Sequence, residues 1–373
     1  MRYLPVSHPF LDIKETDYVN DALKSKAISG FFGEYTPRFE KSFASYCGTK
    51  YGVAVSSGTT ALHIALVAIG IKQGDEVLVS TLTNMATFFA VLYQGAKPIP
   101  IDIESETLNM DPSILESKIT SRTKAIMVVH LFGHPVDMDP VIGVAKKYRL
   151  AVVEDCAEAH GALYKDKKTG SLGDVGCFSF YANKIITTGE GGMVTTDDNA
   201  LTEKMRSLKG LSFGDEFKFM HKDIGYNYKL TNLQAAIGCA QLEKIEMIIG
   251  NKRRIAAYYE QKLKDVQEIQ LPVEKPYARN VFWMYHIVLK GKKADERQLI
   301  MKKLKEKGIE TREGFIPYNL QNTFIERGLT NKEECPVANS VAYNSIYLPS
   351  GPVLREEEMD YVVDNLRNVI VSK

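Results

Sequence analysis

One lysine of the chain, Lys184, lies between two strand-like stretches and beside a run of glycines. The alternating segment FSFY (178–181) precedes it, and TTGEGG and the strand-like MVTTD follow it. The glycines permit positive φ angles and close backbone approach. An amine in this setting has two alternatives. Either its side chain extends to solvent, or the amine stays partly desolvated. Desolvation lowers the pKa of the amine and makes its neutral, nucleophilic form available.

A carboxylate candidate stands at the end of the apolar run LAVVED, where Asp155 is followed by Glu158 and His160. An acid at the end of a buried strand has to be paired or solvated, and it suits a protonated ring nitrogen. The alternative is that Asp155 only caps the next turn. His160 is expected to be a packed residue rather than a catalytic one.

An anion site is indicated by AVSSGTTALHIAL, where a strand ends at Ser57, Gly58 turns and a helix begins at Thr59. Backbone N–H groups, hydroxyls and the positive helix end together suit a single phosphate. The glycine spacings of a Walker loop and of a dinucleotide-binding fold are absent. By itself the segment also fits an ordinary N-cap turn.

These three candidates need a scaffold that brings strand ends together. Short apolar runs alternate with helical stretches between residues 50 and 200, which indicates a mostly parallel sheet covered by helices on both faces. The expected strands are 51–57, 76–81, 97–102, 124–130, 150–155, 176–181 and 192–197, and the expected helices are 59–70, 84–94, 111–118 and 137–148. Ligands of such sheets bind beyond the carboxyl ends of the strands.

Lys184 follows Asp155 by 29 residues (184 − 155), which is enough for one connection and one strand. Both side chains can therefore reach the same cleft as the anion site. A phosphate cradle, a strand-end aspartate and a desolvated amine match the phosphate, the pyridinium nitrogen and the aldehyde of pyridoxal 5′-phosphate (PLP). The combination predicts a PLP site.

The C-terminal part predicts a smaller α+β domain. Residues 231–264 are expected to form one long amphipathic helix, capped by Thr231 or Asn232, that links two domains. Strands at 281–289 and 308–313 and helices near 296–307 and 355–371 follow. The predicted division is 1–250 for the large domain and 251–373 for the small one.

Composition excludes several classes of protein. The 373 residues include 47 basic and 46 acidic ones, so the net charge of +1 points neither to nucleic acid nor to an anionic membrane. The N-terminus lacks the apolar core of a signal peptide and no run reaches membrane-spanning length, so a cytoplasmic protein is expected. The five cysteines read as buried apolar residues, and neither they nor the seven histidines have metal-site spacing, so no metal is expected.

The sequence resembles the sugar aminotransferases of the DegT/DnrJ/StrS family along nearly its whole length. The motifs that carry the likeness are SSGTTALHIAL, GDEVLVST, KAIMVVHLFGHPVDMDPV, VVEDCAEAHGA, GSLGDVGCFSFYANKIITTGEGGMVTTDD and IGYNYKLTNLQAAIGCAQLE. The resemblance implies the PLP-dependent transferase fold of type I, as in aspartate aminotransferase. That fold is α/β, with a large, mostly parallel sheet domain and a smaller C-terminal α+β domain.

The resemblance also implies roles for single residues. Lys184 would hold the cofactor covalently and move a proton between substrate and cofactor, and Asp155 would keep the ring nitrogen protonated. Glu158 matches a contact to the phenolic oxygen. The remaining cofactor contacts would be Ser57, Gly58, Thr59, Asn84 and Ser179, with Asn227 reaching the phosphate from the second subunit of a homodimer that shares its active sites.

Two departures from the family pattern concern ligand contacts. Asn84 stands where relatives usually carry an aromatic ring that stacks on the cofactor, so either its amide lies there or Phe88, one helical turn later, takes the place of that ring. At 313–319 the chain reads EGFIPYN, with Ile316 and Asn319 where relatives carry histidines. The candidate substrate contacts of this region are Arg312, Tyr318 and Asn319.

The activity that the resemblance implies is transfer of an amino group from glutamate, which leaves as 2-oxoglutarate, to a nucleotide-linked 4-keto-6-deoxy sugar. Such sugars serve lipopolysaccharide O-antigen and other surface polysaccharides. The run IITTGEGG after Lys184 is similar to that of 4-aminotransferases rather than 3-aminotransferases. The alternatives are a 3-aminotransferase, a PLP-dependent sugar dehydratase, in which histidine replaces the lysine, and a PLP-binding regulator without turnover.

Overall fold

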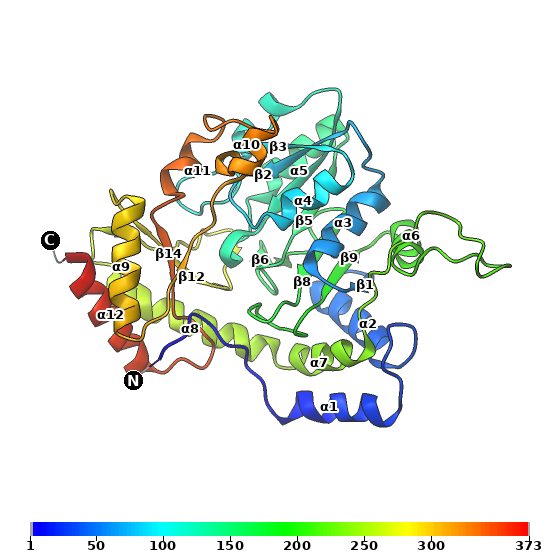
Figure 1. Cartoon of the computed structure of the whole chain (residues 1–373), viewed down its shortest axis with the longest axis horizontal. Helices are drawn as coiled ribbons and strands as arrows, with labels where there is room; N and C mark the ends of the chain where they lie inside the picture. Colours follow the sequence, from blue (N-terminus) through cyan, green and yellow to red (C-terminus); the bar gives the residue numbers. More distant parts are fainter. Residues whose placement is uncertain (1–2, 372–373) are drawn as a thin grey trace.

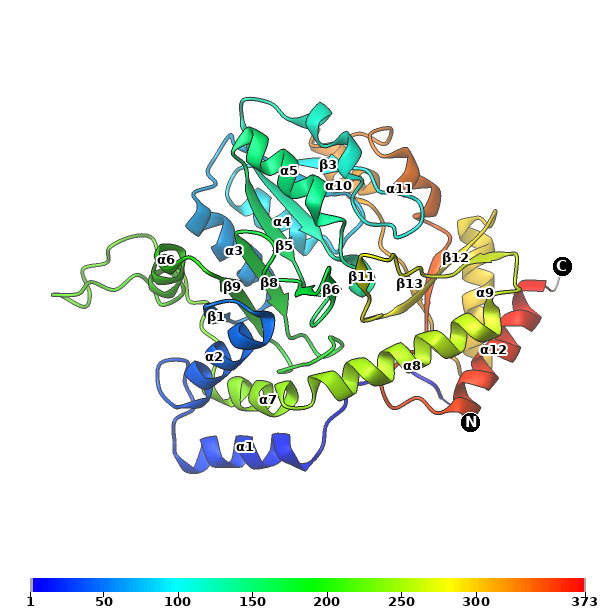
Figure 2. The same ribbon diagram turned by 180° about the vertical axis from the view of Figure 1, so that it is seen from behind.

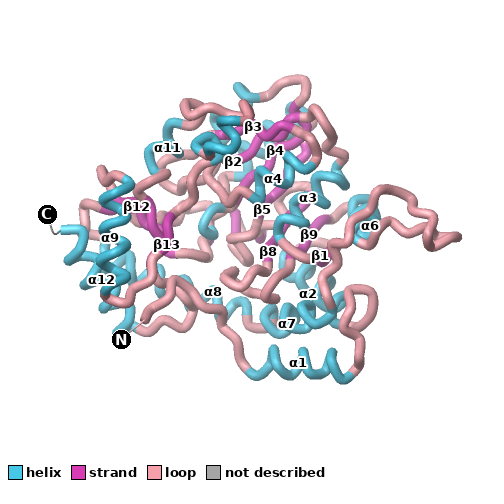
Figure 3. The backbone as a smooth tube through the Cα atoms, in the orientation of Figure 1, coloured by secondary structure: helices cyan, strands magenta, loops and turns pink. Residues whose placement is uncertain are grey.

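The strand-like runs between residues 50 and 200 form one seven-stranded sheet in the computed structural model, which describes residues 3–371. Its strands are β1 (Tyr51–Val55), β2 (Glu76–Ser80), β3 (Lys97–Ile101), β4 (Thr123–Val129), β5 (Ala151–Asp155), β8 (Val175–Ser179) and β9 (Gly192–Thr196). Their order is β1-β9-β8-β5-β4-β2-β3, and every neighbouring pair is parallel except the two that involve β9. The predicted mostly parallel sheet is confirmed, and Figure 3 shows it surrounded by helices.

Helices cover both faces of this sheet because side chains along each strand point alternately to opposite sides. These helices are α2 (Tyr35–Cys47), α3 (Gly58–Ile69), α4 (Ala86–Tyr93), α5 (Met138–Tyr148), α6 (Asn199–Lys209) and α7 (Asn232–Leu242). Val77 and Val79 pack with α3, α4 and α6, whereas Leu78 between them packs with α5 on the other face. Ala54 shares that second face with α2 and α7. The two-sided burial explains why the strands read as continuous apolar runs.

Two of the expected helices differ from the structure. Residues 111–118 form two 3₁₀ turns, η1 (Pro112–Ile114) and η2 (Glu116–Lys118), because the segment is too short to stabilise an α-helix. The long helix expected at 231–264 is broken into α7 and α8 (Ile245–Leu263). At the break Lys244 has φ −117° and ψ 9°, and its amine contacts α1 (Ile13–Lys24), 2.9 Å from Glu15.

A smaller antiparallel sheet lies toward the C-terminal end of α8 (Figures 1 and 2). Its strand order is β10 (Ile269–Gln270), β12 (Tyr285–Leu289), β14 (Ser345–Leu348) and β13 (Arg312–Glu313), and it packs with α8, α9 (Ala294–Glu306) and α12 (Glu356–Val371). The N-terminal segment joins this part of the molecule, since the Leu4 N–H donates to the Gly308 carbonyl at 2.8 Å. The division at 250/251 falls inside α8 and stays a prediction. Residues 1–2 and 372–373 of the two predicted domains lie outside the described residues.

Short elements complete the chain. They are β6 (Leu163–Tyr164), β7 (Lys167–Lys168), β11 (Ala278–Arg279), η3 (Leu131–Gly133), η4 (Tyr318–Leu320), α10 (Asn322–Glu326) and α11 (Pro336–Val341). All five cysteines are buried and unpaired, as expected of small apolar residues. Between residues 3 and 371, no helix has the length and apolar character needed to cross a membrane.

Candidate active site

A cleft of about 430 Å³ lies beyond the carboxyl ends of β1, β2, β5 and β8. The predicted residues that line it are Ser57, Gly58, Thr59, Asn84, Asp155, Glu158, Ser179, Lys184 and Arg312. Parallel strands end at the same edge of a sheet, so the topology collects side chains that are far apart in the sequence. The C-terminal part of the chain adds Trp283, Glu313, Phe315 and Tyr347, and the rest of the lining comes from the part that carries the large sheet.

Lys184 reaches this cleft from the segment between β8 and β9. Its side chain is 11% exposed, and Nζ lies 4.0 Å from Oε1 of Glu158 and 4.0 Å from the ring centroid of Trp283. Burial lowers the pKa of Lys184, while the charges of Glu158 and Asp155 act to raise it. Of the two alternatives for this lysine, the structure has the desolvated amine.

Two buried carboxyl groups follow β5 and face the amine. Asp155 accepts hydrogen bonds from Thr87 Oγ1 (2.8 Å) and from the Ala157 N–H (3.1 Å), and burial raises its pKa. Glu158 accepts from the Phe132 N–H at 2.8 Å, and burial raises its pKa to about 7. Because Glu158 ionises near neutrality, its protonated form can donate a hydrogen bond to an oxygen anion. Asp155 also caps the turn after β5 through its bond from the Ala157 N–H.

The predicted anion site is the N-terminus of α3. Ser57 Oγ accepts from the Thr60 N–H (3.1 Å), and Thr60 Oγ1 accepts from the Ser57 N–H (2.9 Å), so a reciprocal cap fixes the first turn. A Cβ at Gly58 would lie 2.6 Å from the Ser179 Cβ, and one at Gly192 would lie 2.2 Å from the Ser57 carbonyl oxygen. Glycine alone permits this approach, which leaves room for an anion at the helix end.

Asn84 lies on the cleft wall, but its side chain bonds to the nearby backbone. Its Oδ1 accepts a hydrogen bond from the Ala86 N–H at 3.0 Å. Phe88 does not replace the missing aromatic ring. It is fully buried and stacks on Tyr318, with ring centroids 4.0 Å apart and an angle of 3° between the planes. The alternative that assigned Phe88 to the cofactor is wrong, because this face of α4 packs into the core.

Two predicted substrate contacts, Tyr318 and Asn319, lie in the core and not in the cleft. Both are fully buried, and Asn319 accepts from Thr81 Oγ1 (3.0 Å) and donates to Asn339 Oδ1 (2.8 Å). Their nearness to Arg312 in the sequence was misleading, because η4 packs against α4 instead of the cleft. Arg312 itself is on the cleft wall.

Asn227 lies outside the cleft of its own chain. In the segment between α6 and α7 its backbone bridges to Gly210, and its side chain accepts a hydrogen bond from Lys229. A contact to a phosphate in the cleft would have to come from a second subunit, and that contact stays a prediction.

Besides Tyr181, which follows β8, three aromatic residues of the cleft were missed from the sequence, and all three belong to the C-terminal part: Trp283, Phe315 and Tyr347. They come from the segments before β12 and after β13 and from β14, which meet the large sheet only through tertiary packing. The one available signal was that Trp283 is the sole tryptophan of the chain and adjoins a strand-like run.

A buried group of potential metal ligands, His130, Glu154 and Cys156, adjoins Asp155. Glu154 already accepts hydrogen bonds from the Gly170 N–H (2.9 Å) and the Gly173 N–H (2.8 Å), and it lies 2.9 Å from His130 Nε2. Since the carboxylate is saturated with donors, we assign this group a structural role.

The donor set of the cleft fits PLP. The glycine-lined cradle at α3 suits its phosphate, Asp155 its ring nitrogen, Glu158 its phenolic oxygen and Lys184 its aldehyde. These groups lie on one wall of the cleft and leave the small-domain wall for a substrate.

Comparisons with known proteins agree with this geometry. The profile of the DegT/DnrJ/EryC1/StrS aminotransferase family matches residues 9–367. The chain belongs to this family. The GDP-perosamine synthases of Caulobacter vibrioides and Escherichia coli O157:H7 are 43% and 42% identical to it, over 99% and 100% of this chain and 98% and 100% of theirs. The sequence motifs also predict a likeness to GDP-perosamine synthase in particular, which is thereby confirmed.

Solved structures give the same result. Spr1654 of Streptococcus pneumoniae in its PLP form superposes with a TM-score of 0.94 at 27% identity, covering 99% of both chains. The aminotransferase from Psychrobacter cryohalolentis gives 0.90 at 30% identity, over 99% of this chain and 98% of its own. These findings confirm the predicted fold class, the transaminase activity and PLP as the cofactor of this family member.

Proposed function

We propose that this aminotransferase moves an amino group from glutamate to carbon 4 of a nucleotide-linked 4-keto-6-deoxy sugar, as a GDP-perosamine synthase does. The observation that carries the proposal is the single cleft in which Lys184, Asp155 and Glu158 meet the anion cradle. Full-length identity above 40% to two GDP-perosamine synthases supports the choice of sugar.

Each residue of the cleft wall has a proposed task. Bound there, PLP supplies an aldehyde and an electron-withdrawing ring that stabilises negative charge on the substrate carbon. Asp155 holds a proton at the ring nitrogen, and Glu158 hydrogen-bonds the phenolic oxygen. Lys184 Nζ holds the cofactor and moves the proton at the substrate carbon. Ser57, Gly58, Thr59 and Ser179 would contact the phosphate, and Asn84 would contribute to the cofactor site from the same cleft wall.

Lys184 is suited to both of its tasks by its burial. Desolvation favours the neutral amine, which is the form that attacks an aldehyde and accepts a proton. The neighbouring acids prevent a larger fall in its pKa, so the amine can also carry the proton it has taken. The reaction is then of ping-pong type, in which glutamate donates the amino group and 2-oxoglutarate leaves before the keto sugar enters.

Arg312 is the proposed substrate contact on the opposite wall. Its guanidinium is part of the cleft lining and lies 3.3 Å from Glu310 Oε1. A guanidinium can bind either the carboxylate of glutamate or the diphosphate of a sugar nucleotide in two-pronged fashion. Tyr318 and Asn319 are not part of this proposal because they are buried in the core.

We also propose a homodimer with shared active sites. The segment between α6 and α7 protrudes from the chain (Figures 1 and 2), and its large apolar side chains are exposed. They are Phe217 (67%), Phe219 (81%), Met220 (70%) and Ile224 (84%). Such a patch is typical of a surface covered by a second subunit, and the same segment carries Asn227.

The setting we propose is the cytoplasm, where glutamate and nucleotide-activated sugars are both present, and the product would serve lipopolysaccharide O-antigen or another surface polysaccharide.

The deciding measurement is to supply glutamate with a 4-keto-6-deoxy or a 3-keto-6-deoxy sugar nucleotide and to locate the new amine by NMR. Amination of the 4-keto compound is expected. Turnover of the 3-keto compound alone would identify a 3-aminotransferase and overturn the proposed position.

The covalent role of Lys184 is tested separately. Purified protein should show the visible absorbance of bound cofactor, and borohydride reduction should fix the added mass on the peptide that contains Lys184. Conversion of the bound cofactor to its amine form by glutamate would distinguish an enzyme from a regulator. Label on another lysine would exclude the assignment of Lys184.

A further inference from the structure

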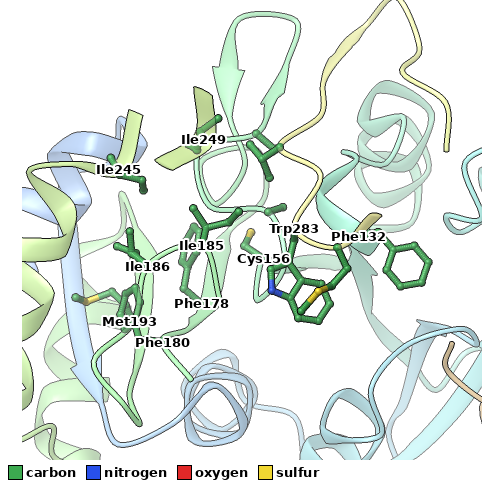
Figure 4. Packing of buried hydrophobic residues seen from close by; sticks show 14 of the residues in the cluster. Phe132, Cys156, Phe178, Phe180, Ile185, Ile186, Met193, Ile245, Ile249 and Trp283 are labelled. Atoms are coloured by element: carbon green, nitrogen blue, oxygen red, sulfur yellow. The ribbon is translucent and has the colours of Figure 1, made fainter. Parts of the chain in front are cut away.

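Trp283 stands over the amine of Lys184 at the rear of the cleft. It is 4% exposed, and its ring centroid lies 4.0 Å from Nζ. Figure 4 shows it in the hydrophobic cluster that also contains Phe132 and Ile185. The same ring therefore belongs to the core on one side and to the cleft on the other.

Trp283 is fixed by hydrogen bonds from both its indole N–H and its backbone N–H. Its Nε1–H donates to the carbonyl of Asn183 at 2.8 Å, the residue directly before the lysine, and its backbone N–H donates to the Phe132 carbonyl at 3.0 Å. Phe132 (φ 55°) and Phe282 (φ 47°) both adopt left-handed conformations, which side-chain-bearing residues rarely do. Strain of this kind persists where the surrounding structure holds a functional group in place.

The contact with the Trp283 ring can hold the Lys184 amine in place, because the nearest carboxylate does not hydrogen-bond it. The Glu158 carboxylate is 4.0 Å from Nζ, which is too far for a hydrogen bond. A cation over the face of tryptophan is attracted to the ring, most strongly where water is excluded. The attraction has no single hydrogen-bond direction, so the amine can turn toward a ligand while it stays over the ring.

A second, much smaller cavity of about 10 Å³ also has Trp283 in its lining. Its lining includes Lys184, Trp283 and the buried Lys252, whose amine donates to the Ser350 carbonyl at 2.6 Å. The cavity is at the lower limit for holding one water molecule. Trp283 and Lys184 line both the cleft and this small cavity, so a smaller side chain at position 283 would enlarge the space open to the lysine.

We propose that Trp283 is a positioning residue that holds the amine of Lys184 over its indole face whenever that amine is protonated and not bonded to the cofactor. The inference rests on the role given to Lys184 under the proposed function. It assigns Trp283 no contact with substrate, so its loss affects the proton-transfer step more than binding.

The contact itself can be measured without cofactor, because Trp283 is the only fluorescent indole in the chain. In cofactor-free protein, an ammonium group against the ring quenches indole emission. Lys184→Met is expected to raise the emission intensity, whereas the control Lys168→Met, which removes an amine 4.5 Å from the Tyr46 ring, should not change it. Equal emission from wild type and Lys184→Met would overturn the proposal.

The positioning role is measured in the loaded enzyme with two substitutions of Trp283. Trp283→Leu keeps an apolar side chain without a π face and is expected to lower kcat on the order of tenfold, with KM for glutamate and PLP affinity unchanged. Trp283→Phe should restore most of the rate. Equal rates of the two variants, or a loss confined to KM, would contradict the role. If borohydride labels a lysine other than Lys184 in wild type, the proposed function fails instead.

Discussion

Glycine at position 58 is required by the distance between α3 and β8. Alanine would place its Cβ 2.6 Å from the Ser179 Cβ, which forces the helix start away from the strand end. We expect Gly58→Ala to weaken PLP binding on the order of tenfold or more, because the anion cradle would open. Cofactor titration measures this. Gly143→Ala in α5, where no atom lies within 4 Å of the added carbon, is the control and should retain wild-type affinity. Unchanged affinity of Gly58→Ala would rule out the cradle as the phosphate site.

Asn84 stands where the family resemblance predicts an aromatic ring against the cofactor, and the structure shows Phe88 turned into the core. A stacked ring would contribute on the order of 1 kcal/mol. We therefore expect Asn84→Tyr to tighten PLP binding about fivefold, measured by the same titration. A marked loss of affinity would mean that the Asn84 amide makes a specific polar contact with the cofactor.

At the scale of elements, strand β12 carries His286, which is buried against Phe132 with ring centroids 4.2 Å apart. Burial lowers the pKa of His286 from 6.5 to about 3. The folded protein keeps this ring neutral, whereas the unfolded chain takes up a proton below pH 6.5. The stability of the wild type therefore falls as pH drops from 6.5 toward 3, and it is unaffected by this group above 6.5.

His286→Phe keeps an aromatic ring stacked on Phe132 and removes the group that can take up a proton. Relative to wild type, we expect the variant to gain about 2 kcal/mol in the free energy of unfolding between pH 8 and pH 5. Urea denaturation at the two pH values provides the comparison. The same difference between variant and wild type at both pH values would show that His286 is not held neutral.

At the scale of the whole molecule, the proposed sharing of active sites between two subunits predicts complementation between them. Lys184→Ala removes the amine of one site, and Asn227→Asp places a negative charge against the phosphate of the neighbouring site. Each variant alone should be inactive. Mixed dimers should regain part of the activity, because one of their two sites has both native residues. Hybrid dimers that form and remain inactive would exclude the shared site.

The strongest sequence patterns in this chain were local ones. Each strand of the large sheet was predicted because burial on both faces demands a continuous apolar run, and Ser57, Asp155 and Ser179 were found because they follow such runs directly. Glycine spacing likewise marked the turn beside Lys184, where Gly189 has a φ of 81°. Such features depend only on residues that are neighbours in the chain, so they can be predicted from a single sequence.

The break between α7 and α8 and the two 3₁₀ turns escaped the same reasoning. Periodicity continues through the break, while the contact of Lys244 with Glu15 depends on a helix more than two hundred residues earlier. The helical periodicity therefore predicted that residues 231–264 are helical, but it did not predict the break between α7 and α8.

The sequence by itself determined the strands, the glycine turns and the three groups that line the cleft, because all of these depend on residues next to one another. Only the tertiary structure decided that Trp283 covers Lys184, that Arg312 reaches the cleft and that Tyr318 and Asn319 do not. Those outcomes depend on how the small sheet packs against the large one. That packing brings together residues from about one hundred to more than two hundred positions apart, and no local pattern records it.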